Sequence, residues 1–82
     1  MFRTRVGTVT VKVNNNPVHV PLRGTALSLK QAAIDQKVAI RINFLLFSVR
    51  PDGSLSPNIP DDRILAFHEG EEFRCVDGDD NS

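Results

Sequence analysis

Residues 40–49 limit the possible folds more than any other segment, because the run is apolar on both sides of a β-strand. Successive side chains of a strand point to opposite faces of the sheet. One face of this run would carry Ile40, Ile42, Phe44 and Leu46, and the other Leu45, Phe47 and Val49, with Asn43 and Ser48 as interruptions. A strand with two apolar faces is typical of the middle of a sheet. The pattern therefore predicts a long central strand whose second face is either covered by other residues or exposed as an apolar contact surface.

The chain has 82 residues, of which 40% are hydrophobic and 24% are charged. This is the composition of an ordinary soluble globular protein, and the length suffices for one small core. The single cysteine, Cys75, excludes an internal disulfide and a cysteine-rich zinc site, which favours the reducing interior of a cell. The sequence shows no signal-peptide pattern and no run of about eighteen apolar residues. We therefore expect a cytoplasmic domain without a membrane span.

Two neighbouring segments alternate in polarity as the strands of a hairpin do. Thr8–Val13 places three valines on one side and polar residues on the other, and residues 18–23 repeat this pattern. Asn14-Asn15-Asn16-Pro17 lies between them, and asparagine tolerates the positive φ angles of tight turns. The sequence thus predicts a β-hairpin. Because Pro21 has no amide hydrogen, its missing bond should point away from the partner strand.

A helix is expected after the hairpin. Gly24-Thr25 ends the second strand, and either Thr25 or Ser28 can cap a helix of about three turns. Small and apolar residues at helical spacing form its packing face: Leu29, Ala32, Ala33 and Gln36, with Ile34 at the edge. Residues 64–67 and 73–76 are short strand candidates.

These elements predict an α+β fold, a roll in the order β-β-α-β-β-β with one helix packed on a mixed sheet. We expect the long third strand to lie beside the first strand, in the middle of the sheet. The folded domain would span residues 1–76. Residues 77–82 contain no apolar side chain, which predicts a flexible acidic tail.

No residue pattern points to catalysis. His19 and His68 are about half the chain apart, and Cys75 in a terminal strand is typical of a small core residue. Asp61 and Asp62, or Asp77, Asp79 and Asp80, could bind calcium, but the last three lack the regular alternation and the closing glutamate of a calcium loop. The glycines are scattered rather than clustered around a phosphate, and no aromatic residues are interleaved with the basic ones as in a nucleic-acid binder. We therefore expect no enzyme, no metal or cofactor, and no nucleic-acid or membrane partner.

The charges are distributed unevenly although the net charge is zero. The first fifty residues carry eight basic side chains against Asp35 alone, and the remainder carries nine acidic ones against Arg63 and Arg74. Three interpretations fit this asymmetry. The basic half binds nucleic acid, or the acidic part of one copy docks on the basic part of another, or the two halves interleave in the fold and their fields cancel.

Two segments are candidates for contact with other proteins. If the helix covers one face of the third strand, the other face presents Leu45, Phe47 and Val49, together with Phe67, as an apolar docking surface. A thicker core would bury both faces, and a shift by one residue would exchange them. The second candidate is the C-terminal tail, whose extended backbone without bulky side chains fits an enzyme channel. A tail that only aids solubility is the alternative.

The order of the elements, the single domain and the tail resemble the ubiquitin-like β-grasp family. More narrowly, four segments are similar to bacterial multiubiquitin-type domains: NFLLF at residues 43–47, IPDD at 59–62, HEGEEFR at 68–74 and DDNS at 79–82. The resemblance implies a protein modifier that is handled by an activating enzyme, a conjugating enzyme and a processing protease. It implies no cofactor on the chain itself, since the activating enzyme uses the ATP.

The tail departs from the ubiquitin pattern because it has no Gly-Gly. The tail residues that would be processed or conjugated are Gly78, Asp79, Asp80, Asn81 and Ser82. Either a protease exposes Gly78 or the end at Ser82 is used directly, and sulfur carriage on a terminal glycine is disfavoured. The expected function is a bacterial ubiquitin-like modifier whose C-terminus is adenylated and passed to a conjugating enzyme and a target. The alternative is a non-conjugated β-grasp interaction module that forms homo-oligomers through its basic and acidic faces.

Overall fold

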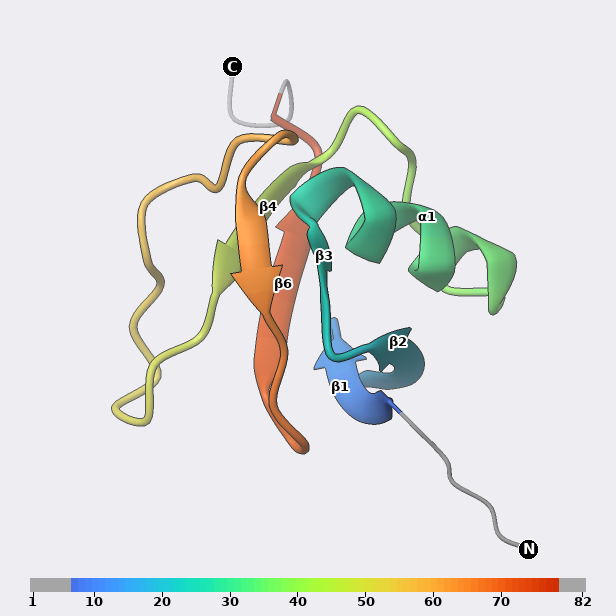
Figure 1. Cartoon of the computed structure of the whole chain (residues 1–82). Coiled ribbons are helices and arrows are strands. Elements are labelled where there is room, and N and C mark those ends of the chain that lie inside the picture. Colours follow the sequence, from blue (N-terminus) through green and yellow to red (C-terminus); the bar gives the residue numbers. More distant parts are fainter. Residues whose placement is uncertain (1–6, 79–82) are drawn as a thin grey trace, which may run out of the picture.

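The computed structural model describes residues 7–78 (Figure 1). In chain order the elements are β1 (Thr8–Val13), β2 (Asn16–Pro21), β3 (Arg23–Thr25), α1 (Ala26–Asp35), β4 (Leu45–Ser48), β5 (Ile64–Ala66) and β6 (Glu72–Val76). Four strands form one sheet in the order β2-β1-β6-β4, and β3 pairs with β5 in a second sheet. The helix packs on one side of the mixed sheet, which confirms the predicted α+β architecture at this level. No helix within residues 7–78 is long and apolar enough to cross a membrane.

The predicted hairpin is confirmed in β1 and β2. Asn14 and Asn15 form its two-residue turn with φ angles of 52° and 71°, and two successive positive values are the signature of the type I′ turn that suits a twisted hairpin. Pro17 and Pro21 lie opposite Lys12 and Thr8, in the alternate pairs that do not exchange ladder bonds. Because β2 is an edge strand, the positions without an amide hydrogen face away from the sheet.

The prediction of a long central third strand is wrong. β4 covers only Leu45–Ser48 and lies at the edge of the sheet, antiparallel to β6. The centre is occupied by β6, which runs parallel to β1. Residues 41–44 form a turn instead, in which the Phe44 amide donates to the Arg41 carbonyl at 3.0 Å. The apolar pattern has a different cause, because Val38 and Ile40 are each only 8% exposed and enter the core from a loop.

The core lies between the inner face of the sheet and α1. Its members alternate along the strands with exposed residues, as half-buried strands require. The sheet contributes Val11, Val13, Val18, Val20, Leu46, Phe73 and Cys75, and the helix contributes Ala26, Leu29 and Ala33. Phe67 also belongs to this core: it is 3% exposed, and its ring meets that of Phe73 edge-on at 6.0 Å. Its assignment to an exposed docking surface is therefore wrong.

The helix begins where one of the two predicted caps places it. The Thr25 side chain accepts a hydrogen bond from the Ser28 amide at 3.1 Å, and the Ser28 hydroxyl donates back to the Thr25 carbonyl at 2.7 Å. A side chain at position 24 would lie 2.6 Å from the Ser28 Oγ, so it would push this hydroxyl out of its bond to the Thr25 carbonyl. The segment that was expected to end the hairpin is the short strand β3, because β5 pairs with it.

The two oppositely charged parts of the chain interleave. β6 and β5 come from the acidic part, yet β6 lies between β1 and β4, and β5 pairs with β3. Of the three interpretations of the charge asymmetry, this topology favours the one in which the two fields partly cancel.

Candidate functional site

The outer face of β4 and β6 presents three cross-strand pairs. Leu45 lies opposite Val76, and Phe47 lies opposite Arg74. The same register brings Val49 beside Glu72, whose carbonyl accepts the Val49 amide at 3.0 Å. We call the side-chain surface of these six residues the outer face. It changes along its length from an apolar pair through a mixed pair to an acidic end.

Exposure differs sharply between neighbouring residues of β4. Leu45 is 36% exposed and Val76, its cross-strand partner, 40%, whereas Leu46 is completely buried. Phe47 and Val49 are half-buried. Leu45, Phe47 and Val49 therefore lie together on the side away from the helix, without Phe67. An apolar and aromatic surface of this kind suits contact with another protein.

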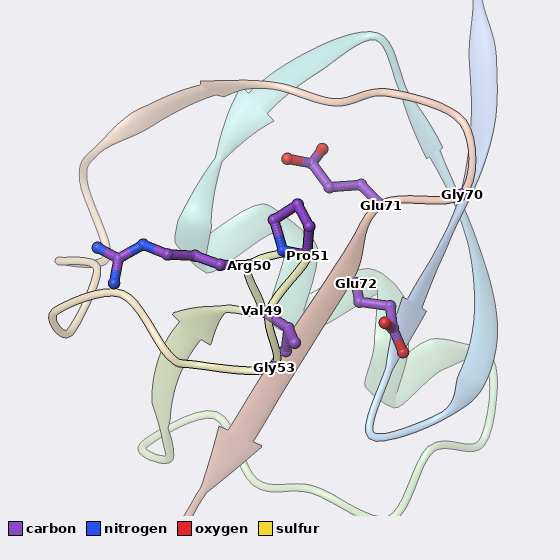
Figure 2. Close-up of a pocket in the computed structure, with 7 residues that line it drawn as sticks. All are labelled: Val49, Arg50, Pro51, Gly53, Gly70, Glu71 and Glu72. Atoms are coloured by element: carbon purple, nitrogen blue, oxygen red, sulfur yellow. The ribbon is translucent and has the colours of Figure 1, made fainter.

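A shallow pocket of about 460 Å³ lies at the acidic end of the outer face. It is lined by Val49, Arg50, Pro51, Gly53, Gly70, Glu71 and Glu72 (Figure 2). Two turns form its walls, and both favour glycine because Gly53 and Gly70 have φ angles of +89° and +82°. The Gly70 amide donates to the Thr10 carbonyl at 2.8 Å, which ties one of these turns to β1.

The charged side chains around this pocket do not converge on a common point. Figure 2 shows the guanidinium of Arg50 directed away from Glu71 and Glu72. It donates instead to the Leu55 carbonyl at 3.3 Å. A Glu71 carboxylate oxygen accepts the His68 amide at 3.0 Å and lies 3.7 Å from the His68 Nδ1. The pocket thus offers separate charges for recognition rather than an acid and a base within proton-transfer distance.

The start of the predicted tail lies against the outer face. A Cβ built on Gly78 would be 3.0 Å from both Cγ and Cδ1 of Leu45, so the backbone passes directly over that side chain. A side chain at position 78 would require the Leu45 side chain to shift by a few tenths of an ångström. The other predicted tail residues, Asp79, Asp80, Asn81 and Ser82, lie outside the described residues. The chain therefore leaves β6 at the apolar end of the outer face.

Lys30 is an important residue that the sequence pattern does not identify. It lies on α1 but is only 3% exposed. Its ammonium nitrogen is 2.7 Å from the Phe44 carbonyl oxygen and 2.6 Å from a carboxylate oxygen of Asp61. A small hollow of about 230 Å³ opens beside this ion pair. Lys30 thus fastens the helix to two separate loops. One sequence feature could have indicated its burial. Lys30 lies four residues after Ala26 and three before Ala33, on the same side of the helix as these two buried alanines.

The remaining candidates for chemistry each have a local partner or are buried. The His19 Nδ1 lies 3.0 Å from the Thr10 hydroxyl. Cys75 is 1% exposed. Burial raises the pKa of its thiol to about 11, and the charges of Lys30 and Asp61 act on it in opposite directions. The thiol is therefore protonated at neutral pH. Over the stretch from residue 7 to residue 78, no three His, Cys, Asp or Glu side chains form a group that could hold a metal ion.

Comparisons of this chain with protein-family models, with curated proteins and with solved structures find no match. Any function of this chain must therefore be inferred from the arrangement of its own residues.

Proposed function

We propose that this chain is a ubiquitin-like β-grasp protein modifier. The order β2-β1-β6-β4, with the first and last strands parallel in the middle and one helix across the inner face, supports the β-grasp assignment. The observation that carries the functional proposal is the position of Gly78 on Leu45. An enzyme that docks on the outer face would thereby have the conjugation tail within reach.

The chemistry would take place on partner enzymes, with this chain as their substrate. The terminal carboxylate of the tail attacks the α-phosphate of ATP on the activating enzyme, and pyrophosphate leaves. An enzyme thiolate then displaces AMP and forms a thioester, which passes by exchange to the conjugating enzyme. A processing protease would first expose Gly78, unless the end at Ser82 is used directly. Gly78 has no side chain to obstruct a narrow channel.

The tail proposal predicts a change in covalent products when residues 79–82 are deleted. If Ser82 is the reacting end, the deletion abolishes the adduct with the activating and conjugating enzymes. If Gly78 is the reacting end, the deletion variant forms the adduct without the protease, whereas the full chain requires it. Intact mass spectrometry of the reaction mixture measures both products.

The deletion should leave the thermal unfolding midpoint unchanged, because β6 ends at Val76, before the deleted segment. An adduct that forms in the same amount and with the same protease requirement as that of the full chain would exclude the tail from the mechanism.

The outer face predicts a loss of partner binding when Phe47 is replaced by Asp. An interface anchor that acquires a charge should weaken binding of the activating enzyme by ~2 kcal/mol, or about 30-fold. Titration calorimetry with the activating enzyme measures this change. Leu22→Asp is the matched control, since Leu22 is 51% exposed and lies outside the outer face. If Phe47→Asp unfolds the protein, as judged by circular dichroism, then Phe47 belongs to the core instead.

The alternative, a non-conjugated module that assembles through basic and acidic faces, has less support. The interleaving of the two chain halves mixes the charges that such faces need. The two proposals are distinguished by salt, since assembly through charge weakens with ionic strength whereas a covalent adduct persists in a denaturing gel.

A further inference from the structure

One edge of the small β3–β5 sheet carries unpaired backbone groups. The Phe67 amide donates to the Leu22 carbonyl at 2.8 Å, and the Ala26 amide donates to the Arg63 carbonyl at 3.0 Å. These bonds continue the antiparallel register, in which Leu65 faces Gly24. Leu65 and the flanking residues Arg63 and Phe67 therefore direct their backbone groups toward β3 and its neighbours, and the amide and carbonyl groups of Ile64 and Ala66 point the other way. Within residues 7–78 these groups have no hydrogen-bond partner.

Both edges of the four-stranded sheet, β2 and β4, are protected against pairing with a further strand, unlike the edge at β5. On β2, Pro17 and Pro21 lack an amide hydrogen, and the amide and carbonyl of His19 both bond to the Gln36 side chain at 2.9 Å. Along β4, the amide and carbonyl of Ser48 both bond to Ser56, at 2.9 Å in each case. Such covering prevents a further strand from pairing there. Among residues 7–78 nothing covers the β5 edge in this way, and Ile64, the first residue of β5, is 64% exposed.

A hollow of about 360 Å³ adjoins β5. Its lining residues are Ser48, Ser56, Pro57, Asn58, Ile59, Arg63 and Leu65. Its lining therefore comes from the end of β4, from the segment that leads from β4 to β5, and from β5 itself. Figure 1 shows that segment on the side of β5 away from β3. Ile59 and Leu65 are half-buried and give it an apolar floor. Arg63 is its only charged lining residue, and the described part of the chain gives the Arg63 side chain no ion pair.

We infer that β5 binds an extended peptide of a partner protein by strand addition. The peptide backbone pairs with the outward groups of Ile64 and Ala66, and every second peptide side chain enters the hollow. Arg63 and Leu65 are two residues apart and share a face of the strand. A fitting peptide therefore carries a carboxylate opposite Arg63 and an apolar side chain opposite Leu65, with one residue between them. In an antiparallel complex the peptide motif is Leu-x-Glu, and in a parallel complex it is Glu-x-Leu.

Two blocked peptides of identical composition test this inference, acetyl-Thr-Leu-Thr-Glu-Thr-amide and acetyl-Thr-Glu-Thr-Leu-Thr-amide. Each is titrated into the ¹⁵N-labelled full chain while the amide resonances are followed by NMR. One of the two should move the amide protons of Ile64 and Ala66 downfield, with a dissociation constant on the order of 1 mM, as expected for a few new hydrogen bonds and one buried side chain. No movement of these two resonances with either peptide, or movement confined to the outer face, would overturn the inference.

Changes to the peptide and to the protein separate strand pairing from nonspecific adhesion. Methylation of the peptide amide nitrogen that donates to the Ile64 carbonyl removes one ladder bond without changing the side chains, and should weaken binding at least about fivefold. This nitrogen belongs to the central threonine in the antiparallel complex and to the leucine in the parallel one. Arg63→Gln should weaken the binding of the parent peptide by about two- to fivefold, whereas Arg41→Gln, at an exposed arginine outside the hollow, should have no effect.

Ile64→Pro removes one outward amide and should abolish binding while the amide spectrum stays dispersed. If this variant does not fold, the methylated peptide on the unaltered protein still decides the matter. Equal binding of the methylated and parent peptides excludes strand addition.

Discussion

Replacement of Lys30 by Ala should lower the free energy of unfolding by ~3 kcal/mol, the range for the loss of a buried, hydrogen-bonded charged side chain. The substitution deletes a side chain that is only 3% exposed and leaves a void between α1 and two loops. It also removes the donor that satisfies the Phe44 carbonyl. Asp61 contributes less to this loss, because its side chain is 55% exposed and water can replace the ammonium. Urea unfolding followed by circular dichroism measures the change.

Two further variants separate the packing of Lys30 from its charge. Lys30→Met keeps most of the volume, so it should recover most of the stability lost in the alanine variant. Asp61→Asn keeps the ammonium buried without its carboxylate partner and should cost ~1 to 3 kcal/mol. A loss below about 1 kcal/mol in Lys30→Ala would show that the lysine is not fastening the helix to the loops, since exposed ion pairs contribute no more than that.

The hairpin and the helix start were predictable because their determinants are local. Alternating valines specify which side of β1 is buried, and two adjacent asparagines supply the turn. Thr25 needs only Ser28, three residues away, to cap α1. The same local pattern was misleading for residues 40–49, because apolar side chains indicate only that a segment avoids water. A loop that inserts Val38 and Ile40 into the core satisfies that requirement as well as a strand does.

The remaining features depend on residues that are distant in the sequence. Lysine is ordinarily exposed, so the burial of Lys30 is explained only by its ion pair with Asp61. Lys30 precedes β4 in the sequence, and Asp61 follows it. Phe67 was assigned to the surface because nothing near it in the chain reveals its contact with Phe73. The central place of β6 and the pairing of β3 with β5 are equally nonlocal. The outer face was partly predictable because the alternation of β4 separates Leu45 and Phe47 from Leu46.

The neighbouring leucines of β4 should respond very differently to truncation. Leu46→Ala removes a completely buried side chain and should cost ~2 to 5 kcal/mol, which lowers the melting temperature by roughly 10 to 30 °C in a domain of this size. Leu45→Ala removes a side chain that is 36% exposed and should cost less than about 1 kcal/mol. Differential scanning calorimetry of the two variants measures this contrast.

The same pair tests the side of the sheet on which the proposed docking surface lies. A strand shifted by one residue would exchange the two leucines, so a larger loss in Leu45→Ala would place the outer face in the core and remove the basis of the modifier proposal. With the register seen here, Leu45→Ala should remain folded yet weaken binding of the activating enzyme, because Leu45 supports the backbone of Gly78 where the tail begins. A stable Leu45→Ala variant with unaltered binding would instead show that the partner does not contact this end of the outer face.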